Sequence, residues 1–387
     1  MIKVWDYIPE YKKHRKEFLN AIDEVFKSST LIFGPKLIEF ENKFKKFVGT
    51  KYGLGVGNGT DALYIAMKAL GIGVGDEVIT TSNTAVPTVT AIVNAGATPV
   101  FVDVDKYYVI NAKLIKSKIT KKTKAIIPVH LYGQACDMDE INQIAKKNNI
   151  HIIEDCAQSH GAEYKGKKTG SLGDVGCFSF YPTKILGTYG DAGFITTNNE
   201  KIYDKMMRIR FLGMERKKMS SGHWNGQYYA VEHGTNSRLD EIHAAILLIK
   251  LKNLHKSIKK RQKIAKVYDK ELKNTDLILP ETNKKNKHAY YVYVVQHRDR
   301  DKIISELIKK NIHLNISYPW PIHIMEPYKK FAKKMSCFKC NKCNYTCLDN
   351  TNLFSKKIFS LPMYPELTLK DQLYTIKSIK KILLNLN

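Results

Sequence analysis

Short apolar runs alternate with stretches of helical spacing along the first half of this chain. The apolar runs predict buried strands, which lie at residues 53–56, 77–80, 99–102, 125–129, 151–155 and 175–180. Between them, apolar residues recur every three or four positions and predict helices at 61–70, 87–94, around Ala112 and at 140–147. Strands that alternate with helices in this way favour right-handed βαβ units. The predicted fold class is therefore α/β, with a mostly parallel sheet that carries helices on both faces.

Both ends of the chain depart from this alternation. Helical spacing covers residues 17–26 and resumes at Gly34-Pro35. Late in the chain the composition becomes more polar, and the strand at 290–295 has the pattern of an antiparallel strand. We expect a boundary near residue 250 between a large domain, 1–250, which includes the N-terminal helical segment, and a smaller C-terminal α+β domain, 251–387.

The length of 387 residues and a hydrophobic content of 43% describe an ordinary globular protein, large enough for two domains. The first residues lead into the charged run Lys12–Lys16 without the apolar region of a signal peptide. The longest apolar stretch, at 244–249, is far too short to cross a bilayer. We therefore expect no membrane insertion and a cytoplasmic location.

A net charge of +26 raises the question of a nucleic-acid partner. Only eight of the 63 basic residues are arginine, the side chain that best recognises phosphates and bases with paired hydrogen bonds. The lysines are spread over many predicted helices, as on solvated helix faces. We expect no nucleic-acid partner, and a positive field of this size would instead attract a small polyanionic substrate.

Four of the seven cysteines are clustered near the C-terminus with the spacing Cys-X2-Cys-X2-Cys-X3-Cys. They are Cys337, Cys340, Cys343 and Cys347. The spacing resembles a bacterial ferredoxin run, but Leu348 stands where proline would follow, and no second set of cysteines exists. Structural zinc is the chemically simpler metal for four thiolates. Free thiols, or a disulfide formed on oxidation, are the simplest expectation for the loop 337–347, so no metal site is predicted.

One lysine stands out because a strand presents it. The apolar run 175–180 predicts a buried strand, and Pro182 cannot continue it because proline offers no backbone N–H to a ladder. Three glycines between 187 and 193 then allow turns that bulkier residues do not. Lys184 thus follows a rigid strand end, where an amine can form a Schiff base with a cofactor carbonyl. Its plain alternative is a solvated loop lysine.

Two polar segments resemble helix starts prepared for an anion. Gly57–Asp61 follows a predicted strand, and its glycines would let a phosphate approach the N–H groups of a helix N-terminus. It does not complete a dinucleotide fingerprint, because the last glycine comes too early. The segment 234–238 precedes a long helix in a similar way. The plain readings are helix capping, by Thr60 in the first segment and by Asn236 or Ser237 in the second.

A carboxylate ends the strand predicted at 151–155. Asp155 in that place can keep a pyridine nitrogen protonated, which makes the ring an electron sink. Gln158 and His160 follow within one turn and can reach the same ring from the side, and Ser179 supplies a hydroxyl five residues before Lys184. A phosphate turn, then a strand-terminal aspartate, then a lysine some thirty residues later together fit pyridoxal phosphate (PLP).

Many ordered segments carry a specific family resemblance. They are 34–41, 57–63, 75–79, 96–103, 129–134, 154–158, the Lys184 loop, 236–239 and 361–365. Along nearly its whole length the sequence resembles the DegT family of PLP-dependent nucleotide-sugar aminotransferases. It is most similar to the branch that aminates C-3 of dTDP-3-oxo-6-deoxyhexoses. The resemblance implies an aspartate-aminotransferase-like fold, which is fold type I of the PLP enzymes.

The resemblance also implies a role for each matching site residue. Lys184 would bind PLP as a Schiff base and shuttle the proton. Asp155 would pair with the pyridine nitrogen, and Gln158 would lie near the phenolic oxygen.

The cofactor phosphate would have a second group of partners. Gly59, Thr60 and Ser179 would hold it from within the same chain. Asn236 would reach the phosphate in the neighbouring subunit, so the resemblance implies a homodimer with active sites shared across the interface.

The resemblance implies transfer of an amino group from glutamate to a dTDP-linked 3-oxo-6-deoxyhexose. The product would be a 3-amino-3,6-dideoxyhexose nucleotide for surface glycans such as lipopolysaccharide. Residues 84–86 and 180–183 resemble the branch specific for C-3. The alternatives are a C-4 nucleotide-sugar aminotransferase and a non-catalytic sensor of the same fold. A sugar dehydratase of this fold would carry histidine in place of Lys184.

Three positions differ from the family pattern. Ile185 follows the lysine where asparagine is common, residues 83–86 lack the aromatic side chain that often stacks on the cofactor, and Ser317 stands where histidine often precedes Tyr-Pro. No substrate-binding residue is predicted from these segments.

Overall fold

The computed structural model describes residues 1–215, 229–333 and 348–386 of the chain. A central sheet of seven strands has the order β2-β10-β9-β6-β5-β3-β4. Its strands are β2 Tyr52–Val56, β3 Glu77–Thr81, β4 Thr98–Val102, β5 Thr123–Ile126, β6 His151–Asp155, β9 Val175–Ser179 and β10 Gly193–Thr197. Within this sheet only β10 runs opposite to the other strands, so the predicted, mostly parallel α/β sheet is confirmed.

The antiparallel β10 decides where the lysine loop lies. Because β9 and β10 run in opposite directions, the connection 180–192 leaves and re-enters the sheet at the same edge. That edge also holds the C-terminal end of β6, since β6 and β9 are parallel. Lys184 and Asp155 therefore lie at one edge of the sheet, where parallel sheets gather their ligand sites.

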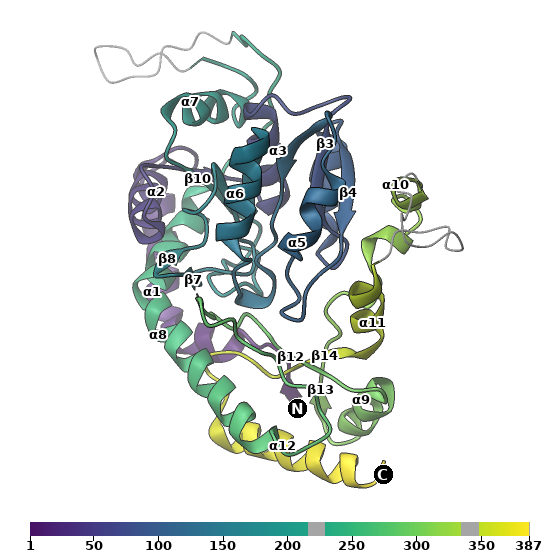
Figure 1. Ribbon diagram of the computed structural model, residues 1–387. Helices are drawn as coiled ribbons and strands as arrows, with labels where there is room; N and C mark the ends of the chain where they lie inside the picture. The colour runs from purple at the N-terminus through teal and green to yellow at the C-terminus, as the bar shows by residue number, and fades with distance from the viewer. Residues whose placement is uncertain (216–228, 334–347, 387) are drawn as a thin grey trace.

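Helices cover both faces of this sheet (Figure 1). They are α3 Gly59–Ala69, α4 Val86–Asn94, α5 Ala112–Ile115, α6 Met138–Asn148 and α7 Glu200–Ile209, with the short 3-10 turns η1 Lys116–Lys118 and η2 Leu131–Gly133. Strand β9 shows why two faces need cover: Cys177 packs into the core on one side, and Phe178 packs into a separate aromatic core on the other.

The aromatic core anchors the segments that flank the lysine loop. Its rings are Phe40, Phe44, Phe178, Phe180 and Phe194, with centroids 5.0–6.3 Å apart, mostly edge to face. They come from α2 (Pro35–Val48), from β10 and from β9 with the residue after it. This packing holds both ends of the connection 180–192 in place.

The N-terminal helices pack against a long helix, α8, which runs from Glu241 to Leu272. Helix α1 spans Ile8–Lys27, and α2 begins at Pro35. The Glu241 carboxylate is buried and accepts hydrogen bonds from three N–H groups at the start of α2, at 2.8–3.0 Å. A carboxylate at a helix N-terminus satisfies unpaired N–H groups and complements the helix dipole. Glu241 thus fixes α2 to the start of α8.

The C-terminal part has its own core beneath the end of α8. It contains β12 Tyr293–Gln296 paired antiparallel with β14 Ile358–Leu361, and β1 Ile2–Lys3 paired parallel with β13 Ile312–His313. Its helices are α9 Arg300–Ile308, α10 Lys329–Lys333, α11 Asp349–Lys357 and α12 Leu369–Leu384, with η3 Ile322–Ile324. A small sheet, β11-β7-β8, pairs Asn286–Lys287 with Glu163–Tyr164 and Lys167–Lys168.

The boundary expected near residue 250 falls inside α8, which is continuous through that point. The division into domains 1–250 and 251–387 stays a prediction. The cysteine loop 337–347 lies outside the described residues. Among the residues that the structure describes, no helix is both long and apolar enough to cross a membrane.

Two capping predictions were wrong in detail. Helix α3 is capped by Asn58, whose side-chain oxygen accepts the Asp61 N–H at 2.8 Å, and Thr60 lies within the helix. The long helix begins at Glu241 after Asp240, and Ser237 contacts the start of α3 instead.

Candidate active site

A pocket of about 560 Å³ lies at the C-terminal ends of β6 and β9 and at the N-terminal ends of α3 and α4. Most of the predicted site residues share it. Its lining is Asn58, Gly59, Thr60, Asp61, Leu63, Ala85, Pro87, Thr88, Asp155, Ala157, Ser179, Tyr181, Lys184 and Asp191. The topology has therefore brought together the glycine turn, the strand-terminal aspartate and the lysine loop.

One corner of the pocket has the donors that an anion needs. Gly59 and Thr60 form the first turn of α3, where backbone N–H groups lack partners within the helix. A Cβ at Gly59 would lie 2.7 Å from the Ser179 Cβ, so only glycine lets the helix approach the end of β9 this closely. The Ser179 hydroxyl and the N–H groups of α3 thus meet at one point, and they could hold a phosphate.

Asp155 is the buried carboxylate of the pocket, with 5% of its surface exposed. Its Oδ2 accepts the Thr88 hydroxyl at 2.8 Å, and its Oδ1 accepts the Ala157 N–H at 3.1 Å. Burial raises the pKa of this carboxyl above its ordinary value, while the two hydrogen bonds and the nearby Lys184 charge act in the opposite direction. Both hydrogen-bond donors are neutral, so the anion is well suited to a cationic partner such as a protonated pyridine nitrogen.

Lys184 lies across the pocket on the connection between β9 and β10. Its N–H donates to the Tyr181 carbonyl at 2.9 Å, and the next two residues, Ile185 and Leu186, are buried in the aromatic core. The side chain is half-buried, and its Nζ lies 4.8 Å from the centre of the Tyr291 ring. This aromatic contact and the shared pocket distinguish Lys184 from a solvated loop lysine.

Gln158 is buried next to the pocket, and its amide is fixed at both ends. Its Oε1 accepts the Tyr132 N–H at 2.9 Å, and its Nε2 donates to the Tyr318 hydroxyl. The amide nitrogen has a second N–H to offer. Gln158 is therefore placed to donate a hydrogen bond beside Asp155.

His160 does not line the pocket, contrary to its expected reach toward the cofactor ring. Its ring is completely buried between Phe178 and Phe180, with centroids 5.6 Å away from each. Burial lowers the pKa of His160 to about 3, which leaves the ring neutral at physiological pH. Its side chain belongs to the aromatic core.

Asn236 also lies outside the pocket lining. It is exposed and forms an isolated bridge with Phe211, while the adjacent Ser237 is buried and accepts the Gly57 N–H at 2.8 Å. The contact of Asn236 with a second subunit stays a prediction.

Sequence reasoning missed several residues that contact the predicted ones. Thr88 holds Asp155, Tyr291 faces Lys184, and Tyr132 and Tyr318 hold Gln158. Tyr132 and Tyr318 both have left-handed backbone, with φ of 59° and 66°, which is costly for large side chains and clusters at functional sites. Tyr132 lies in the family-like segment 129–134 and Tyr318 in the Tyr-Pro pair after Ser317, but neither segment indicates a contact with Gln158, and no motif marks Tyr291 among the 22 tyrosines.

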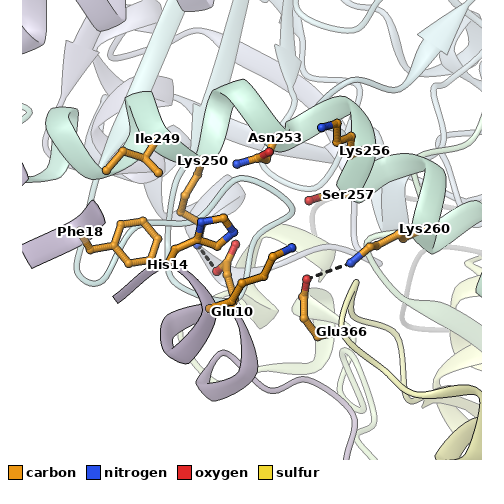
Figure 2. Close-up of a pocket in the computed structure, with 11 residues that line it drawn as sticks. Glu10, His14, Phe18, Ile249, Lys250, Asn253, Lys256, Ser257, Lys260 and Glu366 are labelled. Carbon is orange, nitrogen blue, oxygen red and sulfur yellow. Dashed lines mark hydrogen bonds and ion pairs between the residues drawn. The ribbon is translucent and has the colours of Figure 1, made fainter. Parts of the chain in front are cut away.

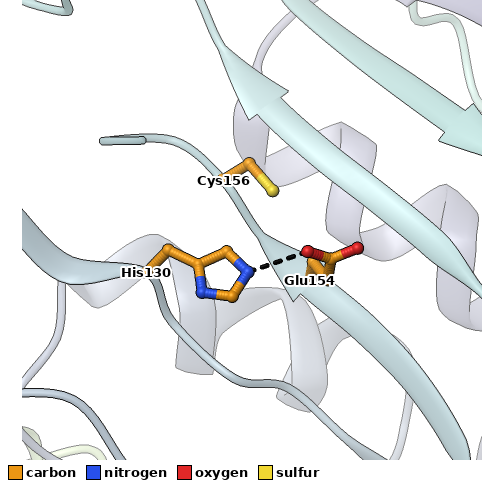
Figure 3. Close-up of side chains that lie close together, drawn as sticks. All are labelled: His130, Glu154 and Cys156. Atoms are coloured by element: carbon orange, nitrogen blue, oxygen red, sulfur yellow. Dashed lines mark hydrogen bonds and ion pairs between the residues drawn. The ribbon is translucent and has the colours of Figure 1, made fainter. Parts of the chain in front are cut away.

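Two other clusters of ionisable groups have structural explanations. A cavity of about 70 Å³ between α1 and α8 contains the paired ions Lys250–Glu10 and Lys260–Glu366 (Figure 2). The side chains of His130, Glu154 and Cys156 also lie close together (Figure 3).

The second cluster is held by hydrogen bonds. Glu154 accepts from His130 Nε2 at 2.9 Å and from the N–H groups of Gly170, Leu172 and Gly173 at 2.7–2.8 Å. The Glu154 carboxylate therefore fixes the loop before β9, and the cluster needs no metal to explain it.

Comparisons with known proteins agree on one family. A model of the DegT/DnrJ/EryC1/StrS aminotransferase family matches residues 12–380. A dTDP-3-amino-3,4,6-trideoxy-alpha-D-glucose transaminase of Micromonospora megalomicea subsp. nigra is 40% identical over 99% of both chains. A UDP-2-acetamido-2-deoxy-3-oxo-D-glucuronate aminotransferase of Pseudomonas aeruginosa is 38% identical over 95% of this chain and 96% of its own.

A solved structure extends the agreement to the fold. The crystal structure of DesV from S. venezuelae, in complex with a ketimine intermediate, superposes with a TM-score of 0.91. It is 32% identical and covers 98% of each chain. The pocket, the family match and the shared fold lead to one conclusion: the chain belongs to the DegT/DnrJ/EryC1/StrS aminotransferase family and is a PLP-dependent aminotransferase that acts on nucleotide sugars.

Proposed function

We propose that this enzyme transfers an amino group from glutamate to C-3 of a dTDP-linked 3-oxo-6-deoxyhexose, and so supplies a 3-amino-3,6-dideoxyhexose nucleotide for surface glycans. The observation that carries the chemical part of this proposal is the single pocket shared by Asp155, Lys184, Ser179 and the first turn of α3. An acid–base amine, a buried carboxylate and an anion site within one pocket are the groups that PLP transamination requires.

Lys184 is the proposed base and acid of the reaction. Bound PLP supplies an electron sink that stabilises negative charge on the carbon from which a proton is removed. The Lys184 Nζ would take the proton from the carbon that bears the amino group of glutamate, and in the second half-reaction it would move a proton at C-3 of the sugar. The Tyr291 ring, 4.8 Å from Nζ, and the anchored residues Ile185 and Leu186 keep this amine in the pocket.

The other proposed site residues bind and orient PLP. Asp155 would pair with the pyridine nitrogen, and its burial strengthens that charge pair because the local dielectric is low. Gly59, Thr60 and Ser179 would hold the phosphate at the N-terminus of α3. Gln158, whose amide oxygen is occupied by the Tyr132 N–H, would offer its amide N–H to the phenolic oxygen.

A homodimer would complete each site. Asn236 is exposed on the segment whose next residue, Ser237, is hydrogen-bonded to Gly57 and Asp61 at the start of α3. The rigid attachment of this segment gives the Asn236 side chain a defined direction. In the proposed assembly it reaches the phosphate in the site of the second subunit.

The proposed sugar position rests on the relatives. The sugar in the name of each of the two relatives carries its amino or oxo group at C-3. One of these sugars is linked to dTDP and the other to UDP. The strong positive charge of the chain suits either nucleotide diphosphate. The position C-3 is therefore better supported than the base of the nucleotide.

Incubation of the purified, PLP-loaded enzyme with glutamate and candidate ketosugars tests the proposal. The panel contains dTDP-3-oxo-6-deoxyglucose, dTDP-3-oxo-6-deoxygalactose, a dTDP-4-oxo-6-deoxyhexose and a UDP-linked 3-oxo sugar. We expect 2-oxoglutarate and a dTDP-3-amino sugar, located by NMR, with the highest kcat/KM for a dTDP-3-oxo substrate. Amination at C-4, or a preference for the UDP-sugar, would contradict the proposal.

A further inference from the structure

The start of α4 places one buried hydroxyl group beside Asp155 and a second one next to the first. Thr88 lies in that turn, directly after Pro87, and Thr84 precedes the helix. The Oγ1 of Thr88 lies 2.8 Å from Asp155 Oδ2, and the Oγ1 of Thr84 lies 2.9 Å from that of Thr88. Both threonines are 1% exposed, so water does not compete for these contacts. The three side chains form a hydrogen-bonded chain from the loop after β3 to the end of β6.

The hydrogen bonds that link Thr84, Thr88 and Asp155 all point in one direction. An ionised carboxylate only accepts hydrogen bonds, and a hydroxyl has a single proton to donate. Thr88 therefore gives its proton to Asp155, and its oxygen is left to accept the proton of Thr84. Hydrogen bonds in such a row strengthen one another, and a bond to a charged acceptor is the stronger kind.

The same contacts offset the cost of burying the Asp155 charge. Its Oδ1 accepts the Ala157 N–H, so each carboxylate oxygen has one donor. The N-terminal end of α4 adds partial positive charge near Oδ2. Burial raises the pKa of Asp155, and the Thr88 hydroxyl is the first of the groups that lower it.

We propose that Thr88 is a positioning residue for the transamination: its hydroxyl, oriented by Thr84, holds the Asp155 carboxylate ionised and in one orientation for the pyridine nitrogen of PLP. The inference rests on the function proposed above for Asp155. Thr88 lines the same pocket, and the two hydrogen bonds of its hydroxyl are with Asp155 and Thr84, so its proposed effect is exerted through Asp155.

Three substitutions separate this role from simple packing. Thr88→Val keeps the branched shape and removes the hydroxyl, Thr88→Ser keeps the hydroxyl, and Thr84→Val removes only the donor that orients Thr88. Thr90→Val is the matched control, because Thr90 is on the same helix and its hydroxyl bonds Tyr328 outside the pocket.

Binding is measured in the Lys184→Ala background, which leaves only non-covalent contacts with PLP. The dissociation constant of PLP is obtained by equilibrium titration, and melting temperatures report folding. We expect Thr88→Val to weaken binding about tenfold, which corresponds to about 1.4 kcal/mol. Thr84→Val is expected to weaken PLP binding two- to threefold. The dissociation constants of Thr88→Ser and Thr90→Val are expected to stay within twofold of the value for the Lys184→Ala background. In the enzyme that retains Lys184, Thr88→Val should lower kcat about tenfold and leave KM for glutamate within twofold.

Asp155→Asn is included so that two failures can be told apart. If Asp155→Asn binds PLP poorly while Thr88→Val and Thr84→Val bind like the parent, the role of Thr88 is refuted and that of Asp155 stands. If Asp155→Asn keeps both the PLP affinity and the kcat of the parent, both assignments are wrong. Equal losses in Thr88→Val and Thr90→Val, or failure of Thr88→Ser to restore binding, would mean that Thr88 only packs the helix.

Discussion

Gly59→Ala should impair cofactor binding through one steric contact. The added Cβ would lie 2.7 Å from the Ser179 Cβ and 3.3 Å from the Ser179 Cα and Oγ. Non-bonded carbon atoms pack at about 3.5–4.0 Å, so the first turn of α3 and the end of β9 must separate by about 1 Å. These two elements carry the N–H groups and the hydroxyl that would hold the phosphate. The substitution therefore opens the anion corner itself.

The magnitude follows from the hydrogen bonds lost. A hydrogen bond to a charged group contributes about 1.5–3 kcal/mol, and loss of one such bond to the phosphate weakens PLP binding about 10- to 150-fold. The assay is titration of the apoprotein with PLP, followed by absorption, together with a melting curve that shows whether the variant is folded.

A second glycine provides the control. Gly73 follows α3, and its added Cβ would meet only ordinary contacts, the nearest being the Ala95 carbonyl oxygen at 3.5 Å. Gly73→Ala should bind PLP like the parent. If Gly59→Ala also binds PLP within twofold of the parent and remains active, the close approach to Ser179 does not build the phosphate site.

Substitutions at four other positions test further parts of the site and fold. Lys184→Ala and Lys184→Arg should abolish transamination without unfolding the chain, and substantial turnover in either would remove the proposed base. Asp155→Asn should lower kcat at least a hundredfold, measured at saturating PLP; parental kcat would mean that another group keeps the ring nitrogen protonated. Asn236→Ala mixed with Lys184→Ala protein should regain activity, because each mixed dimer would contain one complete site; no recovery, with mixed dimers shown by mass, would place Asn236 in its own site or in none. Glu241→Ala leaves three N–H groups at the start of α2, two of them in buried hydrogen bonds, without their acceptor and should cost about 3 kcal/mol in denaturant unfolding; a loss below about 1 kcal/mol would contradict this role.

The order of strands and helices was predictable because it depends on local pattern. Apolar runs of strand length and helical spacing between them are properties of neighbouring residues. The handedness of βαβ units then places strand ends at one edge of the sheet. Asp155 at the end of β6 and Lys184 after β9 were found in this way, and the pocket joins both. Helix caps were less predictable, since Asn58, Thr60, Asn236 and Ser237 are all able to cap.

The contacts that adjust the site depend on residues far apart in the chain. Thr88 bonds Asp155 across 67 positions, Tyr318 bonds Gln158 across 160, and Glu241 bonds Leu37 across 204. The sequence also did not decide the direction of individual side chains. His160 lies two residues after Gln158, yet its ring points away from the pocket and into the aromatic core.

The sequence by itself determined the α/β fold, the glycine turn before the helix that begins at Gly59, and the aspartate and lysine at the strand ends, because each follows from residues close together along the chain. Only the tertiary structure decided that Thr88 would hold Asp155 and that Tyr291 would face Lys184. The physical reason is that hydrophobic burial drives the collapse without specifying partners. Distant polar groups meet only where the packed helices and strands place them. The periodicity of residues along the chain does not encode these pairings.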